Sequence, residues 1–511
     1  MTDQHNDEVT ARDQLTGRVA KGAAWILGAG LFARLLGFVN TIVVARLLVP
    51  EDIGLVAVAT VAMQLLQGFS DIGVSQAVVK FQNADRDELD TLFTFSAARG
   101  LLIGVILACL APVMVNVYSE PRMLWVFLGV AAFPVLTGFI NPCFYEFERD
   151  LRFSKEFIST VVTKFIGVVV SVGVAFYFRT YWAIILGMVV GGGMKLFLSY
   201  AMRPYMPRVS MAAFSKVMGF SGWLTGVSFV AALNNKLDIP ILARLMGSGS
   251  AGVYFLGTQM TELVTSQIAL PLTRAIYPGL SSLQSNTDRM RKAYLNGVAA
   301  LGAFALPAAF GLSFIAEDFT MLVLGEQWLE AIPVIQALAP VIGLQSLFYA
   351  TQSYAIALGK TRLVFFREFI FLFVRVPLFI WAVVSYGFQG AIYAVMASAI
   401  LHVCLNIALY ARVSGHNFMD PILAAKRSLA SVVAMSLYFL FVREQWIVLE
   451  SAPAYVQAGV NIITDVLIGG LIYCLTHAGL WYSAGRPAGL ERTLSETLSA
   501  AFGKVTAAYH R

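Results

Sequence analysis

The sequence predicts an all-α integral membrane protein, and three observations lead to this fold class. Of the 511 residues, 58% are hydrophobic and 13% are charged, whereas soluble domains carry about 25% charged residues. The apolar residues form stretches of about 20, the length that an α-helix needs to cross a bilayer. Basic residues concentrate in the loops on one side of these stretches, as in membrane proteins with a defined orientation.

Fourteen stretches have the length and composition of a membrane-spanning helix. The connections between them are short, so we expect no folded soluble domain. The predicted spans are residues 23–45, 53–79, 92–115, 123–145, 157–178, 181–202, 217–243, 251–277, 293–315, 331–357, 364–384, 388–411, 424–442 and 458–480.

An internal repeat relates the first six spans to the next six. A shift of 198 positions places Gly54 on Gly252, and it places Ala45-Arg46-Leu47 on Ala243-Arg244-Leu245. Because six is even, both lobes begin on the same side of the membrane, and such lobes are expected to enclose the substrate cavity. The predicted organisation is an N-terminal arm (1–22), an N-lobe (23–203), a C-lobe (214–411), two further spans (420–482) and an amphipathic tail (483–511).

Loop charge predicts that both termini are cytoplasmic. The first twenty residues lack an apolar signal-peptide core, so the first span is expected to act as its own insertion signal. The cytoplasmic loops carry Lys80, Arg86, Arg149, Arg152, Lys155, Arg203, Arg208, Lys216, Arg274, Arg289, Arg291, Lys292, Lys360, Arg362, Arg367, Arg412, Lys426 and Arg427. The opposite side has only Arg46, Arg122, Arg179, Arg244 and Arg443.

Six basic side chains fall inside predicted spans and are the main clue to function. A cation in hydrocarbon costs roughly 2.5 to 3.5 kcal/mol on insertion scales, so such residues usually face a bundle interior or a watery cavity and meet an anion there. Lys164 and Lys195 are close enough to the cytoplasmic face to snorkel. The candidate contacts for a negatively charged substrate are Arg34, Arg99, Lys236 and Arg375.

Each candidate cation also has a structural interpretation. Arg34 could pair with an acid such as Asp71, and Arg99 could snorkel to the cytoplasmic face. Arg375 follows Glu368 by seven residues, which is too far for a bridge within one helix. Each of these two residues is therefore expected to face a cavity or to pair with another helix.

Carboxylates inside the spans are candidates for ion coupling, because intramembrane acids mark ion pathways by default. The alternative for each is structural pairing, and Asp465 is interpreted as a packing residue. No cofactor is predicted, and the coupling ion, H⁺ or Na⁺, is left open. The coupling candidates are Asp71, Asp238, Glu262 and Glu368.

Several segments resemble the start of Wzx-type polysaccharide flippases, of the multidrug/oligosaccharidyl-lipid/polysaccharide (MOP) exporter superfamily. These are Gly22-Ala-Ala-Trp through Ala45-Arg-Leu-Leu-Val-Pro-Glu-Asp-Ile-Gly54, and Phe69-Ser-Asp-Ile-Gly-Val-Ser-Gln-Ala77. In the second half, Ala251-Gly-Val-Tyr254 and Leu324-Gly-Glu-Gln-Trp328 are similar to the family's eighth span and to an external loop. The resemblance covers about residues 20–411.

The resemblance implies a MATE-like fold and a flippase of the bacterial inner membrane. Such a flippase moves undecaprenyl-pyrophosphate-linked oligosaccharide repeat units by alternating access for exopolysaccharide, O-antigen or capsule biosynthesis. The implied partners are this lipid-linked oligosaccharide, membrane lipid and the polysaccharide polymerase or export machinery, with no nucleic acid. Guanidinium and ammonium groups suit a pyrophosphate that leaves water. No motif identifies the sugar or the oligomeric state.

Other functions stay open. A peptidoglycan-precursor lipid flippase of the same superfamily also has two spans beyond the core twelve. A cation-coupled multidrug exporter would have few cavity cations and one prominent carboxylate. A membrane enzyme such as a polysaccharide polymerase would have a large external loop with Arg and His, whereas the longest loop here, about 316–330, is acidic. No nucleotide-binding motif is present, so we expect a transporter and not an enzyme.

Overall fold

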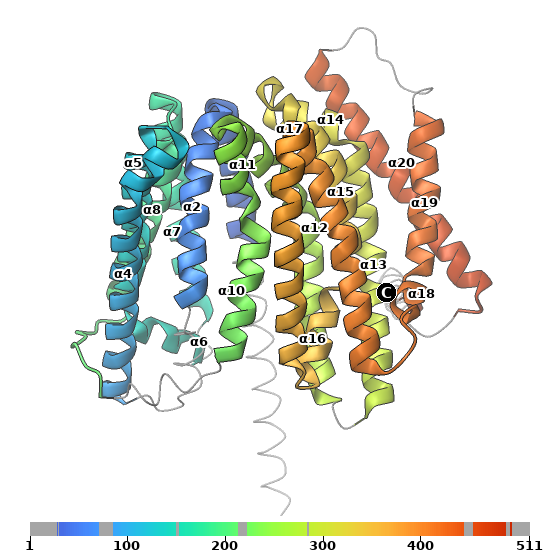
Figure 1. The fold of residues 1–511 in the computed structure, drawn as a ribbon, viewed down its shortest axis with the longest axis horizontal. Helices are drawn as coiled ribbons and strands as arrows, with labels where there is room; N and C mark the ends of the chain where they lie inside the picture. The colour runs from blue at the N-terminus through green and yellow to red at the C-terminus, as the bar shows by residue number, and fades with distance from the viewer. Residues whose placement is uncertain are drawn as a thin grey trace, which may run out of the picture. The chain divides into compact units, whose positions relative to one another are not determined.

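The computed structural model describes residues 28, 30–70, 85–149, 153–212, 222–283, 286–443, 453–486 and 491–492. All regular secondary structure in these ranges is helical (Figure 1). The chain forms two compact units, Met1–Gly252 and Val253–Arg511, which we call unit 1 and unit 2.

Within the described ranges, eight helices are long and apolar enough to cross a membrane. The predicted all-helical membrane class is therefore confirmed. Helices also occupy each of the fourteen predicted stretches, at least in part. Several of these helices are too short to count as a span by length and composition, and others are joined end to end and count as one. The number of fourteen spans stays a prediction.

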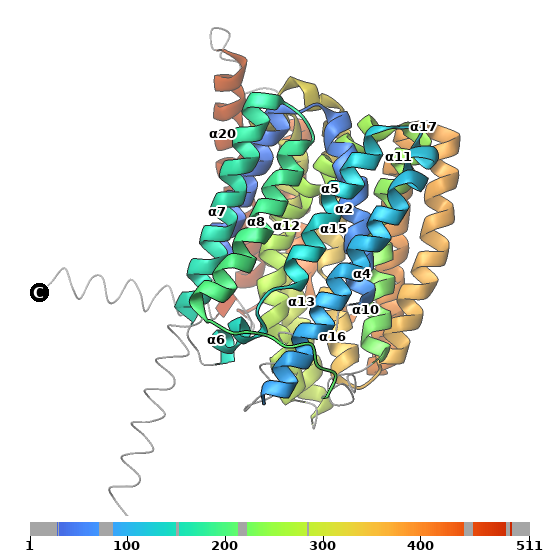
Figure 2. The same cartoon turned by 90° about the vertical axis from the view of Figure 1, so that its left-hand side faces the viewer.

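Unit 1 begins with the helix Gly30–Leu47. The helices α7 and α8 lie side by side as an antiparallel pair (Figure 2). The other elements are α2 (Pro50–Ser70), α4 (Arg86–Tyr118), α5 (Arg122–Gly138), η1 (Pro142–Tyr145), α6 (Glu146–Arg149), α7 (Phe153–Phe178), α8 (Trp182–Met202), α10 (Gly222–Lys236) and α11 (Asp238–Met246).

The helix α4 starts six residues before the span predicted at 92–115. Its N-terminus is fixed by a capping box, in which the Asp85 side chain accepts from the N3 backbone and Glu88 accepts from the Asp85 backbone N–H. This pairing satisfies two otherwise orphan donors at the helix start. The apolar stretch therefore marks the part of the helix suited to the membrane, and polar capping residues extend it beyond that part.

The repeat offset corresponds to a reciprocal contact between α2 and the start of α12 (Ser248–Ser282). A Cβ atom added at Gly54 would lie 1.8 Å from the Ser248 backbone oxygen, and one at Gly252 would lie 2.0 Å from the Pro50 backbone oxygen. Gly252 follows Gly54 by 198 residues, and Ser248 follows Pro50 by 198 residues. The two contacts are therefore made by equivalent positions of the repeat. All four residues belong to unit 1, and the repeat offset relates the two contacts to each other. Only glycine permits so close an approach of the two backbones.

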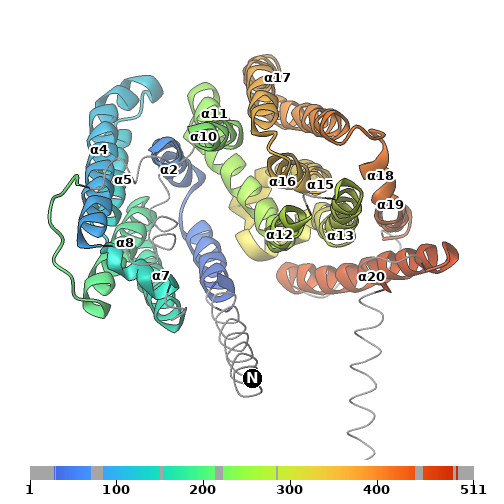
Figure 3. The same cartoon turned by 90° about the horizontal axis from the view of Figure 1, so that it is seen from below.

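Unit 2 starts within α12, and its helices α19 and α20 lie side by side (Figure 3). Trp328, in the turn that follows Gly325, is fully buried. After α12 the elements are α13 (Thr287–Phe314), α14 (Ala316–Phe319), η2 (Thr320–Leu324), η3 (Glu326–Ala331), α15 (Ile332–Ser346), α16 (Tyr349–Ala357), α17 (Thr361–Ser414), α18 (Asp420–Ala424), α19 (Lys426–Phe441) and α20 (Ala454–Ser483).

The 54-residue helix α17 consists of two helical arms that meet at Gly387. Gly387 has φ 60° and ψ −141°, a backbone conformation that side chains other than glycine disfavour. The arms correspond to the two spans predicted at 364–384 and 388–411. Because the chain reverses between them, residues 20 positions before Gly387 come to face residues nearly 20 positions after it.

Three predicted features fall largely outside the described residues. They are the N-terminal arm (1–22), Asp71 and most of the amphipathic tail (483–511). Within the tail, Glu491 forms an ion pair with Arg427 at 3.0 Å and contacts His477 Nε2 at 3.3 Å.

Candidate functional site

Two basic residues of unit 1 lie on helices that contact one another. The helix Gly30–Leu47 carries Arg34, which is half-buried. A Cβ atom at Gly37 would lie 3.4 Å from Cε and 3.5 Å from Nζ of Lys164, so the ammonium group of α7 packs against this helix. Gly37 follows Arg34 by three residues, and residues three apart share a helix face. Arg34 therefore lies one turn from the point at which its helix contacts Lys164, and we call these two residues the cation pair.

The cation pair lies well inside helices that are long enough to span a membrane. Lys164 follows the start of α7 at Phe153 by eleven residues, or about 16 Å at 1.5 Å per residue. Arg34 precedes the end of its helix at Leu47 by thirteen residues, or about 20 Å. Both distances are comparable with, or somewhat larger than, half of a hydrocarbon core of about 30 Å.

Neither member of the cation pair forms an ion pair with a carboxylate in the part of the chain that the structure describes. Lys164 is exposed and Arg34 is half-buried. Lys195 on α8 differs, because it lies close enough to Glu156 of α7 for electrostatic attraction. The two lysines that the sequence analysis treated alike therefore have different surroundings.

The other predicted residues of unit 1 lie on three different helices. Arg99 is half-buried on α4, and Lys236 is half-buried in the last turn of α10. Asp238 begins α11 and is only 5% exposed. Because Leu237 separates the two helices at this point, Lys236 and Asp238 occupy different environments although they are two residues apart.

Unit 2 contains a buried polar network centred on Arg367. Its Nη1 donates to Asn406 Oδ1 at 2.7 Å, and its Nη2 donates to Glu368 Oε1 at 2.7 Å and to Gln352 Oε1 at 3.3 Å. Arg367 and Glu368 are each 6% exposed. The network joins α16 to both arms of α17 and neutralises Arg367 with a carboxylate of the same chain.

His402 completes this network, which we call the Arg367 network. Its Nε2 lies 3.3 Å from Nη1 of Arg367. Because a guanidinium only donates, Nε2 must accept, and the proton of the neutral ring is therefore assigned to Nδ1. Nδ1 of His402 and Nε of Arg367 are buried and form no hydrogen bond within the described residues. Both are donors that a water molecule or another acceptor could satisfy.

Arg375 lies beside this network. Its Cζ atom is 5.7 Å from the centre of the Phe371 ring, a cation–π distance. The same ring lies 4.8 Å from the ring of His402. Phe371 is thus a shared neighbour of the candidate substrate contact Arg375 and of the Arg367 network.

The structure corrects the interpretation of Arg367 and gives Glu368 an unexpected partner. The sequence analysis grouped Arg367 with the cytoplasmic loop cations, whereas it is buried inside α17. Glu368 was expected to face a cavity or to pair with another helix, and it pairs with its own neighbour Arg367. The signal that could have revealed this pair is an Arg-Glu dipeptide between Phe365-Phe366 and Phe369.

The remaining coupling candidates are not gathered at one place in the described residues. Glu262 is exposed on α12, near Tyr349. Asp71 lies outside the described residues. Asp465, expected to be a packing residue, forms an ion pair with Arg443 Nε at 2.8 Å and is 2% exposed.

Comparisons with known proteins place the chain in a family. A sequence family described as "Polysaccharide biosynthesis protein" matches residues 43–333, more than half of the chain, and the chain belongs to this family. It is 26% identical over 370 residues to the lipopolysaccharide biosynthesis protein WzxC of Escherichia coli (strain K12), covering 70% of this chain and 74% of WzxC. It is 22% identical over 451 residues to the succinoglycan biosynthesis transport protein ExoT of Rhizobium meliloti (strain 1021), covering 86% of this chain and 88% of ExoT.

Solved structures show the same fold. The lipid II flippase MurJ, in an inward closed conformation, aligns with a TM-score of 0.70 and 13% identity over 91% of this chain and 100% of MurJ. The MATE transporter VcmN of Vibrio cholerae aligns with a TM-score of 0.54 and 14% identity over 82% of this chain and 98% of VcmN. The predicted Wzx-like membership and MATE-like fold are confirmed, and the chain is a membrane transport protein for polysaccharide biosynthesis and not an enzyme.

Proposed function

We propose that this protein is a flippase for undecaprenyl-pyrophosphate-linked oligosaccharide repeat units. It would move them across the bacterial inner membrane by alternating access, for exopolysaccharide, O-antigen or capsule biosynthesis. Family membership and the similarity to WzxC and ExoT support the pathway. The observation that carries the proposal is the cation pair Arg34–Lys164, which lies within two candidate spans on contacting helices.

The chemistry of the cation pair fits a pyrophosphate. Two like charges held close together inside a membrane repel one another, and an anion between them converts this repulsion into attraction. The planar guanidinium of Arg34 can donate two parallel hydrogen bonds to one phosphate, while the Lys164 ammonium acts as a mobile point charge. A cationic drug would meet repulsion at the same place, so this pair disfavours the multidrug-exporter alternative.

Three further residues complete the proposed substrate contacts. Arg99, Lys236 and Arg375 are half-buried cations of predicted spans, as expected of groups along the path of an anion. Lys164 joins this set because its position against Gly37 differs from that of a side chain that snorkels along its own helix.

The proposed topology has fourteen spans, with lobes at 23–203 and 214–411 and two further spans at 420–482. Both termini and the basic loops face the cytoplasm in this arrangement. Reporter fusions at residues 85, 210, 288 and 418 should therefore read cytoplasmic, and fusions at 120 and 325 should read external. An external signal at 210 would contradict the division into two six-span lobes.

The substrate is tested by reconstitution. Purified protein in phospholipid vesicles should translocate an undecaprenyl-pyrophosphate-linked oligosaccharide, detected by accessibility of the glycan to an enzyme added outside. Peptidoglycan-precursor lipid and a cationic dye serve as the competing substrates. Equal or faster movement of the peptidoglycan precursor would favour a peptidoglycan-precursor flippase over our proposal. The similarity to the MurJ fold does not itself favour that substrate, because the sequence identity is 13%. Movement of the dye alone would indicate a drug exporter.

A further inference from the structure

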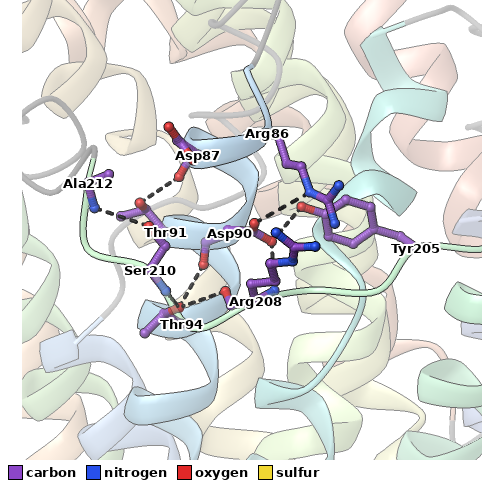
Figure 4. Close-up of polar contacts among 9 residues, drawn as sticks. All are labelled: Arg86, Asp87, Asp90, Thr91, Thr94, Tyr205, Arg208, Ser210 and Ala212. Atoms are coloured by element: carbon purple, nitrogen blue, oxygen red, sulfur yellow. Dashed lines mark hydrogen bonds and ion pairs between the residues drawn. The ribbon is translucent and has the colours of Figure 1, made fainter.

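An extended segment, residues 203–212, follows α8 and runs across the start of α4 (Figure 4). We call it the strap. The Asp90 carboxylate of α4 accepts hydrogen bonds from the Tyr205 hydroxyl at 2.7 Å and from the Arg208 backbone N–H at 2.8 Å. Thr94, one turn further along α4, accepts from the Ser210 backbone N–H at 2.9 Å. The strap is thus fixed along its length and is not a loose loop.

The beginning of the strap is anchored as well. Asn141 Nδ2 donates to the Arg203 backbone oxygen at 2.7 Å, and the Arg203 guanidinium forms an ion pair with Glu146. The Tyr205 ring packs against the apolar cluster that contains Leu89. Burial and the hydrogen bond to Asp90 raise the pKa of Tyr205, so its hydroxyl keeps its proton throughout the physiological pH range.

This fixed backbone presents apolar side chains outward. Met206 and Val209 are each 84% exposed, and Met211 is 56% exposed. They lie next to positions 205, 208 and 210, where the Tyr205 hydroxyl and the backbone N–H groups of Arg208 and Ser210 hold the strap to α4. Exposed apolar side chains so close together form an apolar patch, and such patches mark contact sites for proteins or membranes.

The carboxylates that hold the strap are buried, and two guanidinium groups near it are exposed. Asp90 and Glu146 are each at most 6% exposed. Arg208 is exposed, and the side chain of Arg86 is 56% exposed. Asp85 and Asp87, at the start of α4, are exposed as well.

The strap also lies at the expected level of a membrane surface. The helix α8 has 21 residues, about 31 Å at 1.5 Å per residue, which matches a hydrocarbon core of about 30 Å. The strap begins at the next residue. A segment at this level with apolar side chains and outward guanidinium groups has the composition of an interfacial anchor.

We propose that the strap is a membrane-interface anchor of unit 1. Met206, Val209 and Met211 insert between the lipid headgroups, and the guanidinium of Arg208 binds lipid phosphate. The occupant of this surface is the phospholipid bilayer itself. The proposal is independent of the transported substrate, because it requires only that α4 and α8 cross the membrane.

Nitroxide labels at single cysteines test the anchor in vesicles of phosphatidylethanolamine and phosphatidylglycerol, without any substrate. Met206→Cys and Val209→Cys are made in full-length protein after replacement of Cys109, Cys143, Cys404 and Cys474. His416→Cys, at an exposed polar position after α17, is the control. Collision with oxygen relative to an aqueous nickel chelate should be several times larger at 206 and 209 than at 416.

Two results would overturn the anchor. Labels at 206 and 209 that meet the nickel chelate as freely as the label at 416 would place the strap in water. Labels shielded from both reagents would indicate that a protein surface covers it. If the cysteine-free protein does not fold, Val209→Trp in the otherwise native chain provides the same measurement. Brominated lipid should quench the fluorescence that this tryptophan adds. The fluorescence added by His416→Trp should stay unchanged.

Discussion

Two cations of unit 1 and one buried arginine of unit 2 have opposite surroundings. In unit 1, Arg34 and Lys164 lie on contacting helices, and neither forms an ion pair with a carboxylate of the described residues. In unit 2, Arg367 is held by Glu368 and Asn406 at 2.7 Å each and is almost fully buried. A cation that the protein neutralises itself contributes to the fold, whereas one that it leaves accessible without a counter-ion is available to a substrate.

This difference separates residues that composition alone treats alike. A buried arginine with a full set of protein partners has little capacity left for a ligand, and removing a partner leaves an uncompensated buried charge. Removal of an accessible arginine that has no carboxylate partner in the protein should cost the protein little stability. Stability and transport should therefore respond to different substitutions in the two units.

The largest effect is expected on the stability of unit 2. Glu368→Ala leaves the buried guanidinium of Arg367 without its carboxylate, and breaking a buried pair costs about 3–5 kcal/mol. Denaturant unfolding in detergent measures the loss. The control is Glu330→Gln, an exposed carboxylate of the same unit, which should change little.

A double-mutant cycle sharpens this result. Arg367→Ala combined with Glu368→Ala should cost less than the sum of the single substitutions, because the double variant leaves no unpaired charge. Additive losses would show that the two residues stabilise the protein independently, and the description of the Arg367 network as a neutralised unit would then fail.

The second prediction concerns transport by unit 1. Arg34→Ala removes the two proposed charge-assisted hydrogen bonds to a phosphate, each worth about 1.5 kcal/mol or more. Their combined loss corresponds to roughly 100-fold slower translocation. Arg34→Lys should restore only part of the rate, because it lacks the bidentate fork. Lys164→Ala should also slow translocation. The vesicle assay measures the rates, and protein level and unfolding should stay unchanged.

Lys195→Ala is the matched control for the cation pair. It removes a lysine from a neighbouring span, but one whose charge is attracted by Glu156. Wild-type rates for both Arg34→Ala and Lys164→Ala at normal expression would disprove substrate contact. A loss as large for Lys195→Ala would show that any intramembrane lysine of unit 1 matters, and the distinction drawn from the ion pairs would be wrong.

The sequence predicted the helices, and it singled out Arg34 as a candidate substrate contact, because both inferences depend on local signals. A lone arginine within an apolar stretch is visible without any structure. The partnership with Lys164 is not, because it depends on which helix packs against Gly37. Arg367 was missed for a related reason: it lies near a span boundary, and its partner Asn406 is 39 residues away. Only the reversal of the chain at Gly387 brings these two residues together.

The third prediction concerns ion coupling. Asp238→Asn should keep lipid-linked oligosaccharide binding but lose the stimulation of translocation by an imposed proton or sodium gradient, since Asp238 is a buried carboxylate in a predicted span. The same assay applies to Asp71→Asn and Glu262→Gln. Gradient stimulation that survives all three substitutions would exclude these acids as the coupling site. Glu368→Gln would then be the remaining test, although the Glu368 carboxylate already pairs with Arg367.

The smallest expected effect distinguishes the partners within the Arg367 network. His402→Gln supplies an amide oxygen that can accept from Arg367 in place of Nε2, so unfolding should change by less than about 1 kcal/mol. His402→Leu removes the acceptor and should cost about 1 kcal/mol more, because Nη1 keeps its shorter bond to Asn406. Equal stability of the two variants would show that His402 contributes only by packing against Phe371. A greater loss for Gln than for Leu would contradict the assigned tautomer, since an acceptor at this position would then be unfavourable.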